Sequence, residues 1–306
     1  MRLVLAILVL MAAVDASGQN APATGATKKP PPTWGGCPNE SLAFHACALG
    51  KAKTFNPPRT PTGKPDLQGY WSSRLTMPFS VEGIEDGEPM LTFAPMPWLK
   101  GPGMIVDPAD RKIPYRPWAA EIGRKGTNYE KYLDPRAMCG SGGVPRLALQ
   151  DMSLILQPPG DDAVLWLFED HRVHRAIPMG QPPAVGSAIK LWNGLSRGRW
   201  DRNTLVIDVT NVNGHTWLDD SGNFYTDAAH LTERLTMIDA NTIHYEVTID
   251  DPKAYTRPWK MAWPLVRETA PGIELPEEAC WEGERDIFRL RDLGYRFYFG
   301  ESWLGR

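Results

Sequence analysis

The sequence predicts an all-β protein whose antiparallel sheet closes into a barrel, or alternatively forms a two-sheet sandwich, with long loop insertions and few short helices. Apolar and polar residues alternate along several runs, which is typical of strands with one buried face. The 29 Pro and 28 Gly are typical of short strands joined by structured loops. No internal repeat is evident, which argues against a propeller.

The charge of the chain argues against two classes of partner. The 306 residues carry a formal net charge of −3, whereas a protein that binds nucleic acid or an anionic membrane surface is expected to be basic. We therefore expect no nucleic-acid partner. The 12 Trp are expected to be mainly core residues, because large aromatic rings dominate core burial, although such rings also stack on sugars.

The N-terminus predicts secretion. Met1-Arg2 supplies a short positive region, Leu3–Val14 is apolar but short for a bilayer span, and Ala13–Gly18 supplies small residues for cleavage. We interpret residues 1–19 as the signal peptide of a secreted or periplasmic protein, with no membrane span later in the chain. Residues 20–60 are predicted to be a Pro-rich, disordered leader with a local Cys pair, and residues 61–306 a single β-rich domain.

The 4 Cys are expected to lie in an oxidising compartment, which favours disulfides. Three pairings are possible, and the sequence does not choose among them. We expect Cys37–Cys47, because this pair is local, and with it Cys139–Cys280. A zinc site is the rival interpretation, but there is no Cys-x-x-Cys pair to support it.

The first half of the chain has few predicted elements. Leu42–Lys51 and Pro117–Arg124 are expected to be short helices, and Asp66–Trp71 begins the sheet. Within it, Gly69-Tyr70-Trp71 resembles the start of the first strand of lipocalin-like barrels, which implies a lipocalin- or calycin-like barrel. Met77–Tyr132 is interpreted as a long loop over the barrel mouth, since long ordered loops are usually functional.

The second half contains the predicted strands. Met152–Gln157 and Ala163–His171 are expected to form a hairpin turned by Pro158–Asp162, which Val173–Ile177 extends. Ile287–Phe299 is interpreted as a final strand or a short helix.

The clearest alternation lies between Ser196 and Leu265, where four strands are predicted at Thr204–Val212, His230–Met237, Thr242–Asp250 and Arg257–Leu265. Asp239-Ala240-Asn241 has turn chemistry, so the second and third strands should form a hairpin. On one face these two strands carry Leu231, Glu233, Leu235 and Met237, and Ile243, Tyr245, Val247 and Ile249.

Several motifs resemble those of a large group of secreted soil-bacterial proteins that are abundant in acidobacteria. The signature Gly-Arg-Trp-x-x-x-Thr-Leu-Val-x-Asp is present at Gly198–Asp208. The other similar motifs are Thr60–Trp71, Thr216–Asp219, His230–Arg234, Tyr245–Pro252, Tyr255–Trp259 and Cys280–Gly283. The match covers most of the mature chain and is weakest over residues 77–132. The group is functionally uncharacterised, so the resemblance implies a secreted bacterial protein and no particular activity.

Glu233 is the main candidate for chemistry, because it interrupts an apolar strand face. A buried carboxylate is costly unless it is paired or protonated, and a desolvated Glu has a raised pKa suited to acid or base catalysis. Tyr245 and His230 are expected to assist it, although His230 falls on the opposite face unless a bulge intervenes. The alternative is a structural Glu bonded to an Arg, with Arg199, Arg234 or Arg257 as the partner.

Glu169, at the end of an apolar strand, is the other catalytic candidate. If it faced Glu233 across the barrel, the two carboxylates would resemble the pair of a glycosidase; a solvated strand end is the alternative. Trp217 is a candidate platform for stacking a ligand. The remaining candidate substrate-binding residues are Asn211, Asp220, His171 and Arg234.

The loop from His215 to His230 mixes His and Asp, which are ligands for divalent metals. Its spacing fits no particular site, so we expect no metal and no cofactor, with a divalent metal as the alternative.

Three functional hypotheses follow. The first is a secreted enzyme that uses general acid–base chemistry, hydrolysis or elimination, on a small plant-derived or carbohydrate-like molecule. The second is a non-catalytic, lipocalin-like protein that binds a small molecule. In both cases the expected partner is a small-molecule or saccharide ligand. A third hypothesis, an envelope-associated interaction module, would require exposed aromatic patches.

Overall fold

The computed structural model describes residues 33–73, 80–84, 101–125, 134–149, 152–170, 173–180, 185–278 and 280. The described residues belong to one compact unit. The predicted signal peptide, His171, the predicted element Ile287–Phe299 and part of the predicted loop 77–132 lie outside the described residues.

The described elements are mostly short strands. The helices are α1 (Ser41–Ala52) and α2 (Pro117–Lys125), with short 3₁₀ helices at Pro135–Met138 and Arg146–Ala148. The strands are β1 (Thr33–Trp34), β2 (Cys37–Pro38), β3 (Gly69–Ser72), β4 (Gly83–Ile84), β5 (Gly101–Pro102), β6 (Ile105–Asp107), β7 (Met152–Leu156), β8 (Ala163–Phe168), β9 (His174–Pro178), β10 (Leu195–Asp201), β11 (Thr204–Thr210), β12 (His230–Asp239), β13 (Thr242–Asp250) and β14 (Trp259–Arg267).

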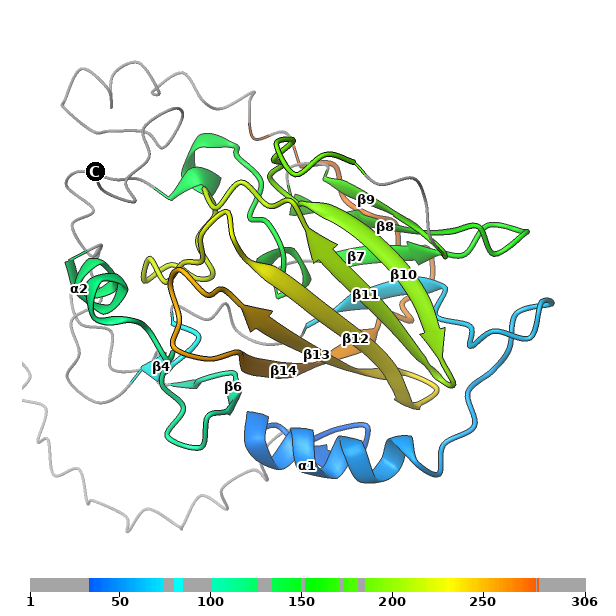
Figure 1. Cartoon of the computed structure of the whole chain (residues 1–306). Coiled ribbons are helices and arrows are strands. Elements are labelled where there is room, and N and C mark those ends of the chain that lie inside the picture. Colours follow the sequence, from blue (N-terminus) through cyan, green and yellow to red (C-terminus); the bar gives the residue numbers. More distant parts are fainter. Residues whose placement is uncertain are drawn as a thin grey trace, which may run out of the picture. The chain divides into compact units, whose positions relative to one another are not determined.

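Nine of these strands form a nearly closed antiparallel barrel (Figure 1), so the predicted barrel is confirmed in preference to the sandwich. Their order is β10-β11-β12-β13-β14-β3-β7-β8-β9. Strands that follow one another among these nine are therefore neighbours in the barrel, and the last strand, β14, pairs with the first, β3. β6 adds a short pairing to β14 beside this ring.

The predicted hairpins and helices are confirmed, and the strand ends have local causes. β11 stops at Thr210 because Asn211 has a positive φ of 58°, which a strand does not accommodate. β14 begins at Trp259, one residue after Pro258, whose nitrogen has no hydrogen to donate to a ladder. β10 was not among the predicted strands.

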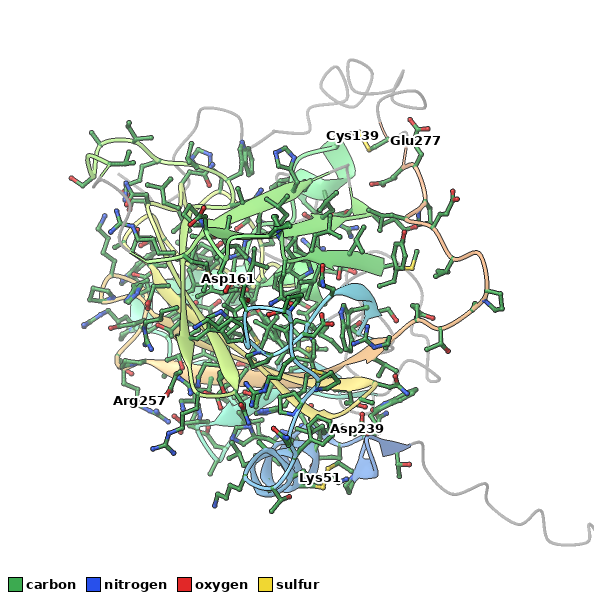
Figure 2. All side chains as sticks on the ribbon, turned by 90° about the vertical axis from the view of Figure 1, so that its right-hand side faces the viewer. Lys51, Cys139, Asp161, Asp239, Arg257 and Glu277 are labelled. Carbon is green, nitrogen blue, oxygen red and sulfur yellow. A yellow bond between two sulfur atoms is a disulfide. The ribbon has the colours of Figure 1, made fainter. Side chains whose placement is uncertain are left out.

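The core of the barrel follows the predicted alternation. Leu205, Ile207 and Val209 of β11 are buried in one hydrophobic cluster with the inward rows of β12, β13 and β14. Large rings fill the interior: the Tyr245 ring lies 4.4 Å from that of Trp263 and 6.1 Å from that of Trp166, measured between centroids. Figure 2 shows how densely side chains occupy the space between the strands.

The weakest join of the barrel lies between β9 and β10. Nine strands that alternate in direction leave the first and last of the order running the same way, so these two can only meet in parallel. They meet at a single bridge, Met179 to Gly198, beside which the Gly180 N–H donates to the Gly198 carbonyl at 3.1 Å. Gly198 permits this approach because a Cβ there would overlap the Met179 sulfur.

Helix α1 packs on the outside of the barrel (Figure 1), where Phe44 and Ala48 form a small hydrophobic cluster with Ile238 of β12. The helix begins after Glu40, whose carboxylate accepts a hydrogen bond from the Ala43 N–H at 2.8 Å and so caps the first turn. The described part of the predicted leader thus carries a helix that contacts the barrel.

Both expected disulfides are present. Cys37–Cys47 ties α1 to β2 across 10 residues, and Cys139–Cys280 spans 141 residues. In Figure 2 the segment near Glu277 accordingly lies beside Cys139. Among the described helices, none is long and apolar enough to cross a membrane.

Candidate functional site

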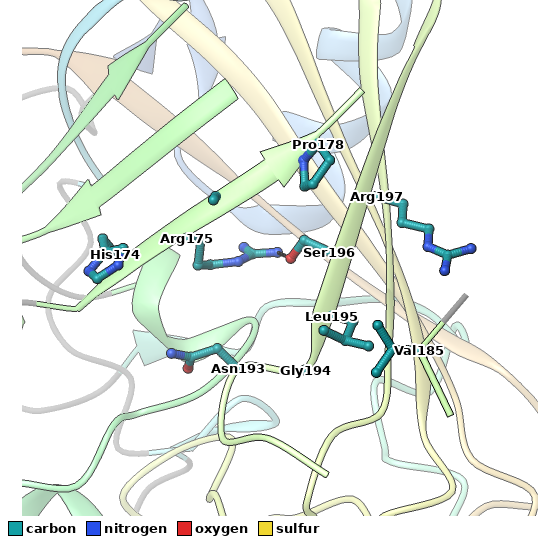
Figure 3. Close-up of a pocket in the computed structure, with 10 residues that line it drawn as sticks. His174, Arg175, Pro178, Val185, Asn193, Gly194, Leu195, Ser196 and Arg197 are labelled. Carbon is teal, nitrogen blue, oxygen red and sulfur yellow. Dashed lines mark hydrogen bonds between the residues drawn. The ribbon is translucent and has the colours of Figure 1, made fainter. Parts of the chain in front are cut away.

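A pocket of about 250 Å³ lies where β9 and β10 separate (Figure 3). Its lining comes from β9, from the start of β10, from the two residues just before β10 and from Val185. Two lining residues, Arg175 and Ser196, belong to the rows that face the barrel interior. The pocket therefore brings the outside of the barrel close to the polar groups of its interior.

Arg175 reaches the interior because of strand alternation. It is paired in register with Trp166 of β8, whose side chain is buried, and it lies two residues before the buried Ile177. Ser196 is on the inward face of β10 by the same rule, since it pairs with Val209 of β11. Figure 3 shows the Arg175 side chain extending from β9 towards Ser196.

The guanidinium of Arg175 binds the carboxylate of Glu233 in the middle of the barrel. Nη1 donates to Oε1 at 3.0 Å, and Nη2 donates to Oε2 at 2.5 Å. The Tyr245 hydroxyl donates to Oε1 at 2.6 Å, and Arg175 Nη2 also donates to Ser196 Oγ at 2.8 Å. Glu233 is 0% exposed and Arg175 is 4% exposed, so the ion pair is almost entirely buried.

The surroundings raise the pKa values of Arg175 and Tyr245, so both groups keep their protons. Burial opposes the charge of Arg175, but the nearby Glu233 carboxylate outweighs it and raises the pKa of the guanidinium. Burial, reinforced by the charge of Glu233, raises the pKa of Tyr245 well above its ordinary value. Arg175 is thus a cation and Tyr245 a neutral phenol at any physiological pH.

One donor of the network remains available. The Nε–H of Arg175 is buried and has no hydrogen-bond partner among the described residues. The guanidinium carbon lies 5.7 Å from the centre of the Trp166 ring, a distance at which a cation is attracted by the ring face. A buried donor without a hydrogen-bond partner lowers the stability of the folded state. This donor belongs to Arg175, which lines the pocket.

A second buried cation, Arg146, holds the loops at one end of the barrel. It forms ion pairs with Asp134, at 2.6 Å, and with Asp220. The neighbouring Asp219 accepts hydrogen bonds from the backbone N–H groups of Val81 and Asn223, at 2.7 and 3.1 Å. Burial raises the pKa of Asp219 to about 6, against the lowering effect of these bonds.

The structure brings two of the four predicted catalytic residues together, Glu233 and Tyr245. His230 lies on the outer face, 49% exposed, 3.4 Å from a carboxylate oxygen of Asp208. The Glu169 carboxylate accepts the Met152 N–H at 3.1 Å, and no contact among the described residues joins it to Glu233.

The predicted substrate-binding residues are dispersed. Trp217 is 1% exposed, so its ring is buried and not open to a ligand from solvent. Asp220 pairs with Arg146. Asn211 donates to the carbonyls of Gly186 and Ile189 at 3.1 and 2.9 Å. Arg234 lies outside the barrel, 3.0 Å from Asp201.

No family model, no curated protein and no solved structure matches this chain. The candidate site therefore stands on its geometry.

The sequence pattern also points to Arg175. Arg175 lies between Val173 and Ile177, in an inward row, in the same way that Glu233 lies between Leu231 and Leu235. Two opposite charges that each interrupt an apolar row are natural partners, since a buried charge needs a counter-charge. The expected partners of Glu233 were Arg199, Arg234 and Arg257; in the structure Arg234 and Arg257 pair with Asp201 and Asp107, and Arg199 is nearest Asp208.

Proposed function

We propose that this protein is a lipocalin-like binding protein that takes a small ligand with a carboxylate or similar acceptor group into the pocket between β9 and β10. The observation that carries the proposal is the unpaired, buried Nε–H of Arg175, a residue that lines that pocket. The order of the strands, each beside its neighbour in sequence, is that of the up-and-down barrels that include lipocalins.

The lining suits a small anion or hydrogen-bond acceptor. It contains Arg175, Arg197, Ser196 and Asn193, and no acidic residue. Leu195 and Val185 add an apolar side, so a ligand with a short hydrocarbon part and one acceptor group fits best. The volume of about 250 Å³ is slightly below the ~300–1,000 Å³ of pockets for drug-sized ligands, which favours a small compound.

Binding is favoured over acid–base catalysis by the state of Glu233. Its two oxygens accept hydrogen bonds from Arg175 and Tyr245, and none of its surface is exposed. A general base must lie within hydrogen-bonding reach of the proton that it removes. In this network the Glu233 carboxylate instead accepts two hydrogen bonds from the guanidinium of Arg175. These bonds hold the unpaired Nε–H of Arg175 in a fixed place.

The proposal is tested with a panel of small aliphatic and aromatic carboxylates, each paired with its neutral amide. Ligand-induced stabilisation and calorimetric titration should select carboxylates over amides. Ala176 is exposed and lines the pocket, so Ala176→Phe should fill the pocket and abolish binding without altering the core. His230→Phe places the same aromatic ring at an exposed strand position elsewhere and should leave binding intact. Equal loss in both variants would contradict the proposal, as would binding that survives Ala176→Phe.

The acid–base enzyme expected from the sequence is the second candidate. In its favour, two ionisable groups, Glu233 and Tyr245, lie 2.6 Å apart inside the barrel. An activity screen on plant phenolic glycosides and oligosaccharides tests it. Any turnover found should fall by about 10²-fold or more in Glu233→Gln, because Gln cannot exchange a proton. Unchanged turnover in that variant would remove Glu233 from the mechanism.

The proposed location is secreted or periplasmic, in a protein similar to the secreted soil-bacterial group. The two disulfides support it, because such bonds persist mainly in oxidising compartments. Mass spectrometry of the protein from its native cell should find a chain without residues 1–19 and with both disulfides. A cytosolic, reduced chain with an intact N-terminus would contradict this proposal.

A further inference from the structure

Two histidines and a glutamate meet on the outside of the barrel, away from the pocket. His244 and Glu246 are two residues apart on β13 and therefore share its outer face, opposite Tyr245. His45 comes from α1, which packs over this face. His244 is 3% and Glu246 is 7% exposed, and the side chain of His45 is 18% exposed.

The three side chains are arranged around a common point. His45 Nδ1 lies 3.0 Å from His244 Nε2 and 3.8 Å from Glu246 Oε2. One ligand atom from each residue lies within 4.8 Å of the other two. In a tetrahedral zinc site the bonds to His nitrogen and carboxylate oxygen are about 2.0–2.2 Å long, which separates neighbouring ligand atoms by about 3.3 Å.

A hydrogen bond between the two imidazoles explains only part of this arrangement. It accounts for the 3.0 Å separation of the nitrogens, but the 3.8 Å from His45 to the carboxylate is too long for a hydrogen bond. A shared ion accounts for both distances.

The ligand atoms are carried by rigid elements. β13 is hydrogen-bonded to β12 on one side and β14 on the other. The helix that carries His45 is held by the Cys37–Cys47 disulfide and by Phe44 and Ala48 against Ile238. The other oxygen of Glu246, Oε1, lies 3.3 Å from Lys260 Nζ, which orients the carboxylate in the way that outer-shell partners orient metal ligands.

We propose that His45, His244 and Glu246 bind one divalent transition-metal ion, with Zn²⁺ the best match to the ligand set, and that this ion joins α1 to the barrel. Two His and one Glu are a known zinc ligand set, and in such sites the fourth position is open to water or another ligand. Of the three residues, His45 is the most exposed. The site is independent of the proposed ligand pocket.

The test uses the tag-free protein with both disulfides intact, first treated with chelator and then titrated with ZnCl₂. We expect one Zn²⁺ per chain and a melting temperature that rises with the zinc concentration, because an ion that binds only the folded state stabilises it. His45→Gln should weaken zinc binding by more than about 100-fold, since even outer-shell changes cost about 10–100-fold. His45 is partly exposed on a helix, so His45→Gln should fold. Glu246→Gln, the second variant, should also weaken zinc binding.

His230→Gln is the matched control, because His230 also lies beside a carboxylate, that of Asp208, on an outer strand face. It should bind zinc as tightly as the parent protein. Co²⁺ in place of Zn²⁺ should give visible absorption bands that disappear in His45→Gln and persist in His230→Gln. The proposal is overturned if no saturable binding is found, or if His45→Gln binds zinc as tightly as the parent.

Discussion

Arg175 and Glu233 each carry a charge into the barrel, and each is stable there because of the other. Two hydrogen bonds join the guanidinium to the carboxylate, while the Arg175 Nε–H has no partner among the described residues. A buried pair of this kind contributes little net stability compared with apolar residues. The loss of one partner is strongly destabilising, because it leaves the other charge buried without a counter-charge. The pair therefore constrains which substitutions the interior accepts.

This coupling is measurable by a double-mutant cycle. Arg175→Met should lower the free energy of unfolding by about 3–5 kcal/mol, because the Glu233 carboxylate is left buried without a counter-charge. Arg175→Met combined with Glu233→Gln should recover much of the loss, since Gln is neutral and still accepts from Tyr245. Urea unfolding of the four proteins measures the cycle. Losses that simply add would show that the two side chains are not coupled.

Asp219 makes stability depend on pH. Its pKa is about 6 in the folded protein against an ordinary 3.8, so the folded state holds this proton more tightly than the unfolded state does. The contribution of Asp219 to stability is therefore greatest at low pH and falls by up to about 3 kcal/mol as the pH rises from about 4 to about 6.

The comparison of the parent with Asp219→Asn isolates this effect, because the other carboxylates contribute equally to both proteins. The difference between their unfolding free energies should shift in favour of Asp219→Asn as the pH rises through this range. A difference that stays constant with pH would show that burial does not raise the pKa of Asp219.

At the scale of elements, the two disulfides constrain loops of very different length. Cys37–Cys47 closes 10 residues and Cys139–Cys280 closes 141. In the chain-entropy account a cross-link stabilises by restricting the unfolded chain, and the effect grows with the logarithm of the loop length.

Replacing both partners of the long-range bridge with Ser should therefore cost about 2 kcal/mol more than replacing both partners of the local bridge. Urea unfolding under chelating conditions measures the two costs without a contribution from bound metal. Equal costs would show that the long loop already has structure in the unfolded chain, or that native packing dominates.

At the scale of the whole molecule, the barrel is uneven around its circumference. β12 and β13 have ladder partners on both sides, whereas β9 and β10 have one full ladder each and meet at a single bridge. The candidate ligand pocket lies at this join, where the barrel opens at the lowest cost in hydrogen bonds.

Native-state hydrogen exchange should reveal this unevenness. Backbone N–H groups of β9 and β10 that face the join should exchange much faster than those of β12 and β13, since their opening breaks few contacts. A ligand in the pocket should slow exchange at the join and leave the central strands unchanged. Uniform protection around all nine strands would contradict the weak join.

Local pattern was sufficient for much of the fold. The rows of Leu205 on β11, Glu233 on β12 and Tyr245 on β13 were predicted to face inward, and they do. Period-two alternation is a property of neighbouring residues and is visible in any sequence. β10 escaped prediction because its inward positions, Ser196, Gly198 and Trp200, do not form an apolar row.

The partners of those side chains depend on the tertiary structure. Arg175 meets Glu233 from 58 residues away, and His45 meets His244 from 199 residues away. Alternation places each residue inside or outside the barrel, but the order, register and closure of the strands decide which residues meet. The sequence by itself therefore determined which face of each strand is buried and that Glu233 points inward. The closure of the barrel decided that Arg175 is the counter-charge of Glu233, that a pocket lies between β9 and β10, and that His45, His244 and Glu246 meet.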